Sequence, residues 1–428
     1  DNDSAGKEGA TKVLQLLPDA LIIKLPEGVK DYCEYRKQYS ASDFQALVKT
    51  VITENTLSYE EFCQVVDKWL LLPDKNVLKV IFASLISHYF TADPLWVFLV
   101  APPSGTKTEL ITLLSALPIV YMMSDLTTKT LFSGLEGKRK ASPSLMMRLP
   151  NSIITMKDFT TVLSMRAEDK SIILGQLREI YDGRYDKPFG TGEEVHWKGR
   201  ITLIAGVTGI IDAQQAVLRV MGERFVMYRI IQPNDEEVAE KALSISGQEK
   251  EMRQELKTAM RKFFWGITIP KIGEITIPLE IIKSLSSLAS FIVIARSGII
   301  RNSYGLKEIE LIPEPEAPAR LAKQLGVGIK SLAVLMGKKE VGWEEYYLIL
   351  RIALDTVPRT KISHLVALMN DDFGTKTSDV ATKTGYSLSG AEMILEDLFA
   401  LKLVGKTDWG QGTTPLWHLT EKCLGYLG

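Results

Sequence analysis

The stretch VFLVAPPSGTKTEL, residues 97–110, changes character twice. An unbroken apolar run gives way to a loop of Pro, Ser and Gly, and then to a segment with the apolar spacing of a helix. It therefore predicts a buried strand, a tight loop and a helix. Two more apolar runs, SIITM (152–156) and RITLIAGVT (200–208), predict further buried strands. Strands that alternate with helices indicate a parallel α/β sheet.

The loop after the first strand carries Lys107 and Thr108, the pair that ends a phosphate-binding loop. In such a loop backbone N–H groups cradle phosphates, the lysine reaches the β- and γ-phosphates of ATP, and the threonine holds Mg²⁺. Thr106 and Ala101 stand where the usual motif has glycine, so a plain strand–turn–helix connection is the alternative. The expected ATP contacts are Ala101, Pro102, Pro103, Ser104, Gly105, Thr106, Lys107 and Thr108.

A candidate acid, Asp158, follows the second strand in the sequence IITMKDFT. An acid at the end of a strand beside a phosphate loop can hold Mg²⁺. ATPases of this type usually carry Asp-Glu here, whereas this chain has Lys157 and Asp158. Either Asp158 is the Mg²⁺ acid and the glutamate is missing, or Asp158 takes the glutamate position and Lys157 replaces the Mg²⁺ acid. Both alternatives argue against fast hydrolysis.

The composition excludes several classes of protein. The 428 residues carry 51 Lys and Arg against 52 Asp and Glu, so binding of nucleic acid has to come from local patches. The three cysteines and four histidines form no metal-binding spacing and no disulfide framework, which fits a cytoplasmic protein. No apolar run is long enough to span a membrane, and the first residues lack the pattern of a signal peptide.

The order of the phosphate loop, IITMKDF, RITLIAGVT, MGERF and APARL resembles an AAA+ ATPase over about residues 90–357. It is similar to the branch with a hairpin before sensor 1, which includes MCM-like and other replicative helicases of mobile elements. The resemblance implies ATP and Mg²⁺ as cofactors and a ring of six copies as the assembly. It also implies a catalytic set, which is Lys107, Asp158, Thr208, Arg224 and Arg320.

The resemblance implies a role for each of the last three residues of this set. Thr208 is the polar sensor-1 residue, and Arg320 is the sensor-2 arginine of a helical lid. Arg224 is the finger that stabilises charge on the ATP of a neighbouring subunit, which is why a ring is required. Arg219 and Arg229 are rival fingers. Ordinary solvated charges are the alternative for Arg224 and Arg320.

Two extended runs, RYDKPF and EEVHWKG, surround a Gly-Thr-Gly turn and predict a β-hairpin directly before the third strand. In the AAA+ branch named above, a hairpin at this place projects into a central DNA pore. Cations there would contact phosphates and aromatic rings would stack on bases, most simply of single-stranded DNA. The alternative is a surface hairpin whose aromatic residues pack on their own domain. The expected DNA contacts are Arg184, Lys187, Phe189, His196 and Lys198.

Two further segments leave their alternatives open. The basic loop LEGKRKASPS (135–144) is either a second pore loop or a solvated charge run. Residues 361–428 predict a helix, a helix-turn-helix and a hairpin with the wing DWGQG, which resembles a winged-helix domain. Its presumed recognition helix carries Glu392, Glu396 and Asp397 and few cations, so contact with protein is nearly as good a prediction as contact with DNA.

The first forty residues resemble the second half of a TOPRIM domain, the catalytic fold of DnaG-like primases. The resemblance rests on Asp1 and Asp3, the Ala-Gly turn, a helix, the apolar strand LIIKL (21–25) and LPEGVKD. The paired aspartates would hold Mg²⁺ for nucleotidyl transfer. A TOPRIM domain also needs an acid on an earlier strand, so primer synthesis is not expected from these residues. The alternative is a chance pair of acids in a polar terminus.

The expected fold class is therefore α/β. The chain is expected to hold a partial TOPRIM segment (1–40), a helical linker (41–88), an AAA+ core (89–235), a helical lid (236–358) and a winged helix (359–428). The function that follows is an ATP-dependent DNA helicase, part of a primase–helicase of a phage or mobile element. The alternative is a slow or non-hydrolysing AAA+ initiator or loader that binds DNA, or a nucleotide-gated scaffold.

Overall fold

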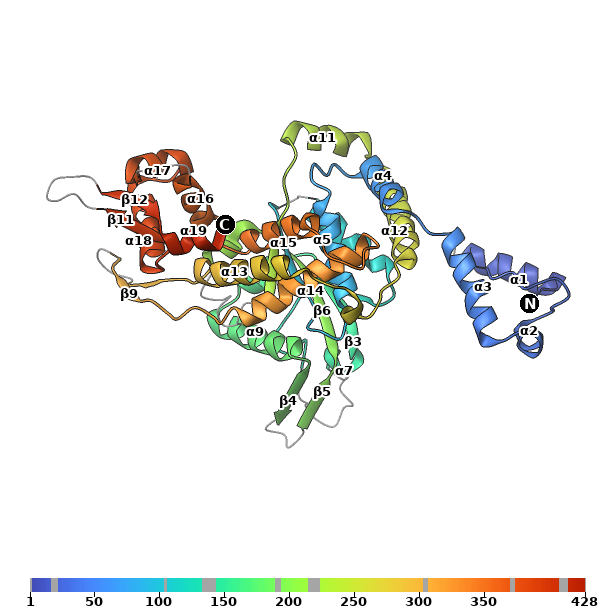
Figure 1. Ribbon diagram of the computed structural model, residues 1–428. Coiled ribbons are helices and arrows are strands. Elements are labelled where there is room, and N and C mark those ends of the chain that lie inside the picture. The colour runs from blue at the N-terminus through green and yellow to red at the C-terminus, as the bar shows by residue number, and fades with distance from the viewer. Residues whose placement is uncertain are drawn as a thin grey trace. The chain divides into compact units, whose positions relative to one another are not determined.

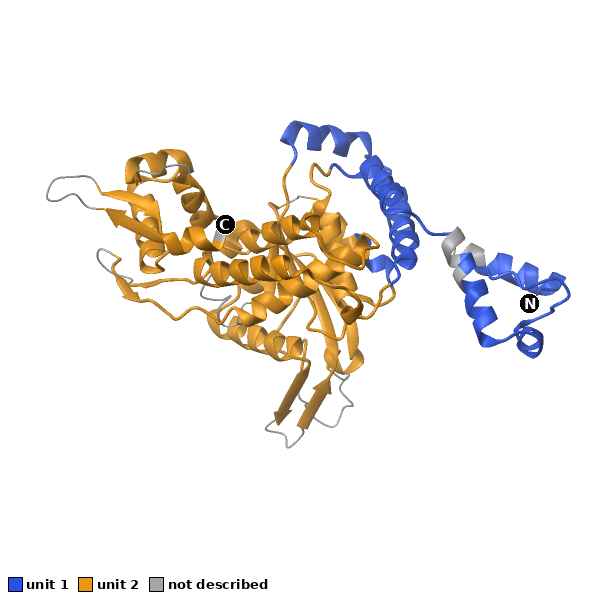
Figure 2. Cartoon of the chain, viewed as in Figure 1, with its two compact units in different colours: residues 1–71, 113–117, 233–268 blue, residues 72–112, 118–232, 269–428 orange. Residues whose placement is uncertain are grey.

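The computed structural model describes residues 2–16, 22–103, 106–132, 144–188, 194–214, 224–302, 307–369, 374–407 and 415–427. The chain divides into two compact units (Figure 2). Unit 1 is built from residues 1–71, 113–117 and 233–268, and unit 2 from 72–112, 118–232 and 269–428. The segments expected as a helical linker and as a lid are each shared between the two units. The domain boundaries inside each unit stay predictions.

Unit 2 contains a sheet of five parallel strands in the order β2-β3-β6-β1-β7. Two of its neighbouring strands, β3 and β6, are labelled in Figure 1. The three strands expected from their apolar runs are present, which confirms an α/β fold with a parallel sheet. The other two strands, β2 and β7, were not anticipated by the sequence. The bounds are β1 Trp96–Val100, β2 Val120–Met123, β3 Asn151–Met156, β6 Arg200–Val207 and β7 Phe225–Arg229.

The sheet is buried because its strands are apolar on both faces. All five residues of β1 are buried, and so are all but the first residue of β6. Phe98 of β1 stacks on Phe225 of β7, with ring centroids 3.8 Å apart and planes 8° from parallel. A strand that is covered on both faces reads as a continuous apolar run, which is why β1, β3 and β6 could be recognised from sequence.

The part of unit 2 before residue 359 also contains helices, two short strands and a hairpin. The longer helices are α5 Asn76–Ser87, α6 Lys107–Leu113, α9 Ala167–Tyr181, α13 Leu279–Ala295, α14 Ala319–Leu335 and α15 Trp343–Asp355. The short elements are α7 Leu145–Arg148, α8 Thr160–Leu163, the 3-10 turns η2 Gly209–Ala213 and η3 Ile272–Glu274, and the strands β8 Ile300–Arg301 and β9 Ile309–Leu311. The helix predicted after the phosphate loop is confirmed.

The predicted hairpin is present, formed by β4 Arg184–Pro188 and β5 Glu194–Lys198. Two glycines face each other where it joins the sheet. Gly183 has a φ of +79°, and Gly199 donates its N–H to the Gly183 carbonyl at 3.1 Å. A Cβ on Gly199 would lie 2.0 Å from the Pro150 carbonyl oxygen, so no larger residue fits there. The hairpin is thus fixed to the start of β6.

The C-terminal module, defined here as residues 359–427, has the predicted sequence of helices followed by a hairpin. Gly385, with a φ of +74°, ends α17 in the left-handed conformation and makes the turn into α18. The wing residues 408–412 lie outside the described residues. The elements are α16 Arg359–Leu368, β10 Thr375–Lys376, α17 Thr377–Thr384, α18 Leu388–Ala400, β11 Val404–Thr407, β12 Leu416–Leu419 and α19 Glu421–Leu427.

The described part of unit 1 is helical. Ser58 begins one helix with a capping box to Glu61. Phe62 stacks on Phe263 across two of the helices, with ring centroids 5.3 Å apart. The elements are α1 Ser4–Leu16, α2 Tyr32–Gln38, α3 Ala41–Glu54, α4 Tyr59–Trp69, η1 Leu114–Ala116, α11 Asp235–Ser244 and α12 Glu249–Gly266.

The apolar run at 21–25 is not a strand over its described residues, 22–25, and this prediction from the sequence was wrong. A strand needs a neighbouring strand to pair its backbone N–H and C=O groups, and no strand is described in unit 1. Instead, the Asn2 side chain donates to the Val29 carbonyl at 3.2 Å. Across the described residues, no helix is both long and apolar enough to cross a membrane.

Candidate functional site

A cleft of about 800 Å³ lies at the carboxyl ends of β1, β6 and β7 in unit 2. Pro102 and Pro103 follow β1, Thr208 follows β6, and Ile230 follows β7. Ligands of open parallel sheets bind beyond the carboxyl ends of the strands, and this volume suits a small-molecule ligand. The cleft is therefore in the place where the predicted phosphate loop requires its ligand.

Lys107 is folded back over the loop that leads to it. Its Nζ donates to the carbonyl oxygens of Ala101 at 3.0 Å and Pro102 at 3.1 Å, and the side chain is buried. Burial lowers the pKa of Lys107, and the nearby Asp158 carboxylate opposes this shift. A lysine held by carbonyl groups rather than by an acid can exchange these partners for phosphate oxygens. Ser104 and Gly105 lie outside the described residues.

Gly206 of β6 makes room for Lys107, and sequence reasoning missed it. A Cβ at this position would lie 2.4 Å from the Lys157 carbonyl oxygen and 3.3 Å from Cδ of Lys107. The Gly206 carbonyl also accepts a hydrogen bond from the Phe159 N–H at 2.7 Å. The only signal in the sequence was a glycine inside an apolar strand, which marks a close approach of another group.

The candidate residues after β3 and β6, Asp158 and Thr208, each form a hydrogen bond with Thr160. Asp158 accepts a hydrogen bond from the Thr160 N–H at 2.9 Å. The Thr208 N–H donates to the Thr160 hydroxyl at 3.2 Å, and the two hydroxyl oxygens lie 3.4 Å apart. Asp158 and Thr208 are thus at the same edge of the sheet as Lys107. The exposed Thr108 is the residue after Lys107 in α6.

An ion-pair network forms one wall of the cleft. Arg229, a rival finger in the sequence, makes a bidentate pair with Asp212, at 2.9 and 2.6 Å. Its Nε donates to the Asp355 carbonyl at 3.0 Å, and its backbone N–H donates to the Asp355 carboxylate at 2.8 Å. Burial raises the pKa of Asp355 to about 6. Arg351 pairs with Asp74, which also accepts a hydrogen bond from the Tyr228 hydroxyl.

Arg224 lies at the opposite edge of the sheet. It precedes Phe225, which pairs with Trp96 at the amino end of β1. The residues of β1 span about 16 Å, so Arg224 cannot reach a ligand beside Lys107 of the same chain. Its guanidinium is nearly buried and pairs with Asp182 at 2.6 Å. The other rival finger, Arg219, lies outside the described residues.

Arg320 is at this amino edge too, at the start of α14. One turn further along, Gln324 donates to the Tyr181 hydroxyl at 3.1 Å and to the Arg224 carbonyl at 2.8 Å. Arg320 itself pairs with Glu316 at 2.8 Å. The structure therefore groups Arg320 with Arg224 and separates both from Lys107, Asp158 and Thr208.

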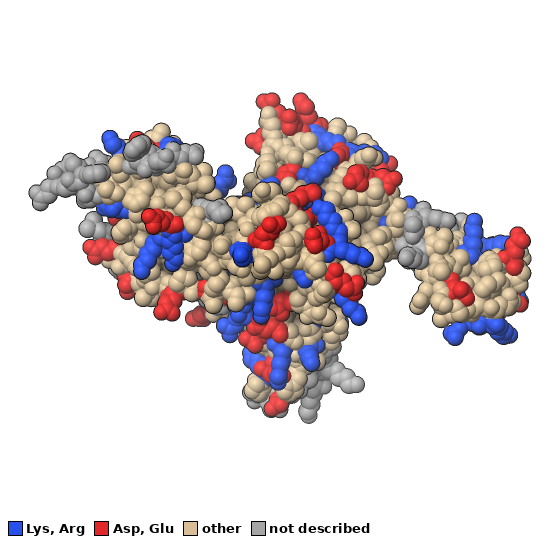
Figure 3. Space-filling model, viewed as in Figure 1, with Lys and Arg blue, Asp and Glu red and all other residues tan. Residues whose placement is uncertain are grey.

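The hairpin presents a mixed set of charges. By the register of its strands, Arg184, Asp186, His196, Lys198 and Glu194 share one face. Arg184 pairs with Asp186, and the two ring nitrogens of His196 lie 2.8 Å from Asp186 and 3.1 Å from Glu194. These hydrogen bonds raise the pKa of His196. Figure 3 shows basic and acidic side chains interspersed in this part of unit 2.

The aromatic residues of the hairpin strands pack inward. Tyr185 stacks on Phe132, with ring centroids 3.7 Å apart, and Trp197 meets the same ring edge-on. Both are buried, so these two rings follow the alternative of packing on their own domain. Lys187 is exposed on this second face, and Phe189 lies outside the described residues. Residues 135–143 of the second basic loop lie outside them as well.

Arg200, another cation of this region in the sequence, is structural. Its guanidinium donates to the carbonyls of His88 at 2.6 Å and Ser87 at 2.8 Å at the end of α5.

In the predicted recognition helix, α18, two acidic side chains bind an arginine of the same chain. Arg301 of β8 donates to Asp397 at 2.8 Å, to Glu396 at 3.2 Å and to the Met393 carbonyl at 3.0 Å. These acids of α18 are therefore engaged within the chain, and the choice between contact with protein and contact with DNA stays a prediction.

The N-terminal acids show no metal site in the described residues. Asp3 accepts a hydrogen bond from the Gly6 N–H at 2.7 Å, just before α1 begins, and Asp1 lies outside the described residues. Within the described part of the chain, no group of three or more His, Cys, Asp or Glu side chains could hold a metal ion.

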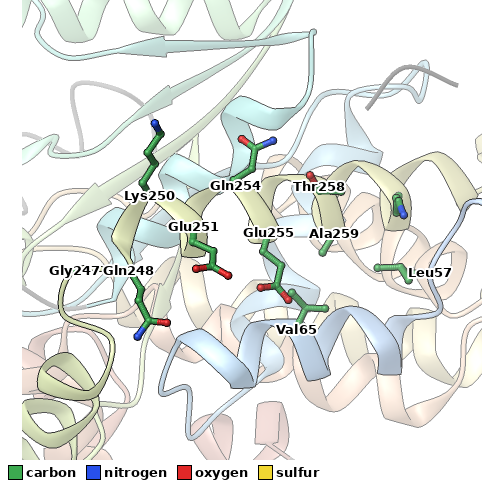
Figure 4. Close-up of a pocket in the computed structure, with 11 residues that line it drawn as sticks. Leu57, Val65, Gly247, Gln248, Lys250, Glu251, Gln254, Glu255, Thr258 and Ala259 are labelled. Carbon is green, nitrogen blue, oxygen red and sulfur yellow. The ribbon is translucent and has the colours of Figure 1, made fainter. Parts of the chain in front are cut away.

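A second cleft, of about 860 Å³, lies in unit 1 between α4 and α12 (Figure 4). Leu57, Val65 and Ala259 contribute its apolar surface. Glu255 at its rim is already engaged by Lys68 at 2.6 Å and by the Trp69 indole N–H at 2.8 Å. None of the residues predicted from motifs lines this cleft, so the cleft in unit 2 is the better candidate. No protein-family model matches the chain, and a search of curated proteins found no similar sequence.

Proposed function

We propose that the chain is an ATP-dependent DNA helicase module of the AAA+ type, from a primase–helicase of a phage or mobile element. The observation that carries this proposal is the grouping of Lys107, Asp158 and Thr208 at the carboxyl edge of a parallel sheet, beside a cleft of about 800 Å³. These are the residue types and positions that a phosphate loop, a Mg²⁺ acid and a sensor require.

The residues fit a nucleotide with its metal. Lys107 would bind the β- and γ-phosphates, and the exposed Thr108 and Asp158 would hold Mg²⁺. The metal supplies neutralisation of the charge on the phosphates. Gly206 keeps the space that the Lys107 side chain needs, and Thr208 stands where a polar residue meets the ligand. The missing glutamate after Asp158 implies slow turnover in the absence of a partner.

The amino edge of the sheet supports a ring. Arg224 and Arg320 are too far from Lys107 to act on the ATP of their own chain, so in this proposal they act on the ATP of a neighbouring copy. The hairpin extends from this same edge, because β5 ends directly before β6 begins. In a ring it would contact the phosphates of single-stranded DNA through its exposed cations.

A second candidate function is a nucleotide-gated DNA-binding protein without turnover. Lys157 stands where the Mg²⁺ acid or its neighbour is expected, and the Asp158 carboxylate is held by the Thr160 N–H. Such a site would bind ATP and change its affinity for DNA but would not release phosphate. The N-terminal segment would be a TOPRIM remnant and the C-terminal module a winged helix in either case.

Phosphate release by the full chain with and without single-stranded DNA tests these alternatives. The helicase proposal expects DNA-stimulated release that is lost in Lys107→Ala and retained in Lys376→Ala, a change of an exposed lysine in the C-terminal module. ATP-dependent DNA binding with no release supports the second function. A chain that neither binds ATP nor changes its DNA affinity with ATP contradicts both.

A further inference from the structure

The first turn of α16 lines the cleft of unit 2 together with the phosphate loop. Arg359 and Ile362 come from α16, whereas Ala101, Pro102 and Pro103 come from the loop after β1. The C-terminal module therefore forms part of the wall of the candidate nucleotide site in its own chain. Nothing in the motif pattern of the sequence indicated this, because Arg359 lies far from the phosphate loop in sequence.

Three arginines line this cleft, and they differ in their partners. Arg229 is held by Asp212 in a bidentate pair, and Arg351 is paired with Asp74. Arg359 is exposed, and none of the residues that the structure describes forms an ion pair or a hydrogen bond with its side chain. An exposed guanidinium at the wall of a cleft is available to an anionic ligand, whereas the other two would first have to leave their carboxylates.

The backbone before Arg359 is held close to the cleft. The Arg229 side chain donates to the Asp355 carbonyl at 3.0 Å and to the Val357 carbonyl at 3.3 Å, which are the residues that join α15 to α16. Its Nε and Nη2 thus fix the start of the C-terminal module to the end of β7. These hydrogen bonds hold the backbone just before Arg359 at the wall of the cleft, so the position of the residue is fixed while its exposed side chain can turn toward a ligand.

We propose that Arg359 binds a phosphate group of the nucleotide in the same chain, so that the C-terminal module completes the site. This inference rests on the proposed function. The planar guanidinium matches phosphate oxygens bidentately, and Ile362 with Pro102 offers apolar contact to the uncharged part of the nucleotide. Nucleotide occupancy would then restrain the C-terminal module, which links the site to whatever partner that module contacts.

Calorimetric titration of the full chain with MgATP and with adenosine tests the proposal. Arg359→Gln should weaken MgATP binding about tenfold, the loss expected for one charge-assisted hydrogen bond to phosphate. It should leave adenosine binding unchanged, because the base and ribose keep their contacts. Arg359→Lys should recover part of the affinity, since it keeps the charge without the fork. Arg36→Gln, an exposed arginine of α2, is the matched control.

The outcomes separate this inference from the proposed function. A wild-type chain that binds no MgATP overturns both. A wild-type chain whose MgATP affinity is lost in Lys107→Ala but unchanged in Arg359→Gln overturns the role of Arg359 and leaves the nucleotide site standing. An equal loss for MgATP and adenosine in Arg359→Gln also overturns it, because the phosphate would not be the group that Arg359 binds. Thermal unfolding of each variant identifies any that fails to fold.

Discussion

The two edges of the parallel sheet in unit 2 are built for different tasks. At the carboxyl edge the polar groups converge on a cleft, and Lys107 is bound to backbone carbonyls. At the amino edge Arg224 is paired with Asp182, and the hairpin carries cations beside acids. The difference teaches that the sequence motifs, which follow one another along the chain, do not lie together in the folded chain: Lys107 is at one edge of the sheet and Arg224 at the other. Under the proposed function, the two edges would be half-sites that a second copy of the chain completes.

Gly206→Ala would break the carboxyl edge and is expected to have the largest effect on nucleotide binding. The added Cβ would meet the Lys157 carbonyl and crowd the Lys107 side chain, so MgATP affinity should fall by about 100-fold, as for removal of the lysine. Calorimetric titration measures this. Gly175→Ala in α9 is the control, because its Cβ would meet nothing within 4 Å. Normal affinity in Gly206→Ala would show that Lys107 does not need this space.

Mixing two inactive variants tests whether the edges of neighbouring copies meet. Arg224→Ala and Lys107→Ala should each abolish phosphate release, while a 1:1 mixture should recover roughly a quarter of the wild-type rate, because that fraction of sites has both an intact lysine and an intact neighbouring arginine.

Asp182→Asn distinguishes a direct role of Arg224 in phosphate release from an effect on stability. It breaks the ion pair of Arg224 but leaves the arginine in place. Unfolding in urea should show a loss of about 2 kcal/mol in each variant of this pair. Full activity of Arg224→Ala alone would remove Arg224 from the site, and a mixture of two inactive variants that recovers no activity would contradict a site shared between neighbouring copies.

Asp355, at the carboxyl edge of the sheet, should make the free energy of unfolding depend on pH. Its pKa is about 6 in the folded chain against an ordinary value of 3.8, so between these values the folded state binds a proton that the unfolded state lacks. Stability should therefore fall as the pH rises from about 4 to about 6, by about 1.4 kcal/mol for each unit of pKa shift. Asp355→Asn should remove this slope in urea unfolding, and Asp169→Asn, an exposed control on α9, should retain it.

The hairpin at the amino edge should show the smallest effect. His196 keeps its positive charge to a higher pH than an ordinary histidine, because Asp186 and Glu194 accept its hydrogen bonds. Binding of single-stranded DNA should weaken about threefold as the pH rises through this raised pKa, and His196→Gln should remove that dependence. Lys198→Ala should instead reduce the slope of log affinity against log salt concentration by about one, and this reduction should be the same at every pH. Fluorescence anisotropy measures both, and a pH profile unchanged in His196→Gln would contradict the role of this ring.

The sequence predicted the elements whose pattern is local. The strands β1, β3 and β6 are continuous apolar runs, and the turn of the hairpin is marked by Gly-Thr-Gly, so both elements were found. The strand expected at 21–25 was wrong over its described residues because an apolar run does not show whether a partner strand exists. The aromatic residues of the hairpin could not be assigned from sequence, since the burial of Tyr185 depends on Phe132, a residue far away in the chain.

The candidate site was predicted in part for the same reason. Lys107 and Thr208 follow strands, and a position after a strand can be recognised in a parallel sheet. The pairing of Arg229 with Asp212 and the approach of Arg359 depend on how distant segments pack, and no local pattern encodes that. The edge of the sheet at which Arg320 lies could not be predicted either. It depends on the packing of α14 near Tyr181, where Gln324 of α14 donates to the Tyr181 hydroxyl.

The glycine pair at the base of the hairpin has a mechanical consequence. Gly183 and Gly199 leave no side chains between the strands where they join the sheet, and Arg200 next to them is anchored to the carbonyls at the end of α5. A side chain at Gly199 would have to push the Pro150 carbonyl away, so a substitution there would disturb the start of β3 and the base of the hairpin together.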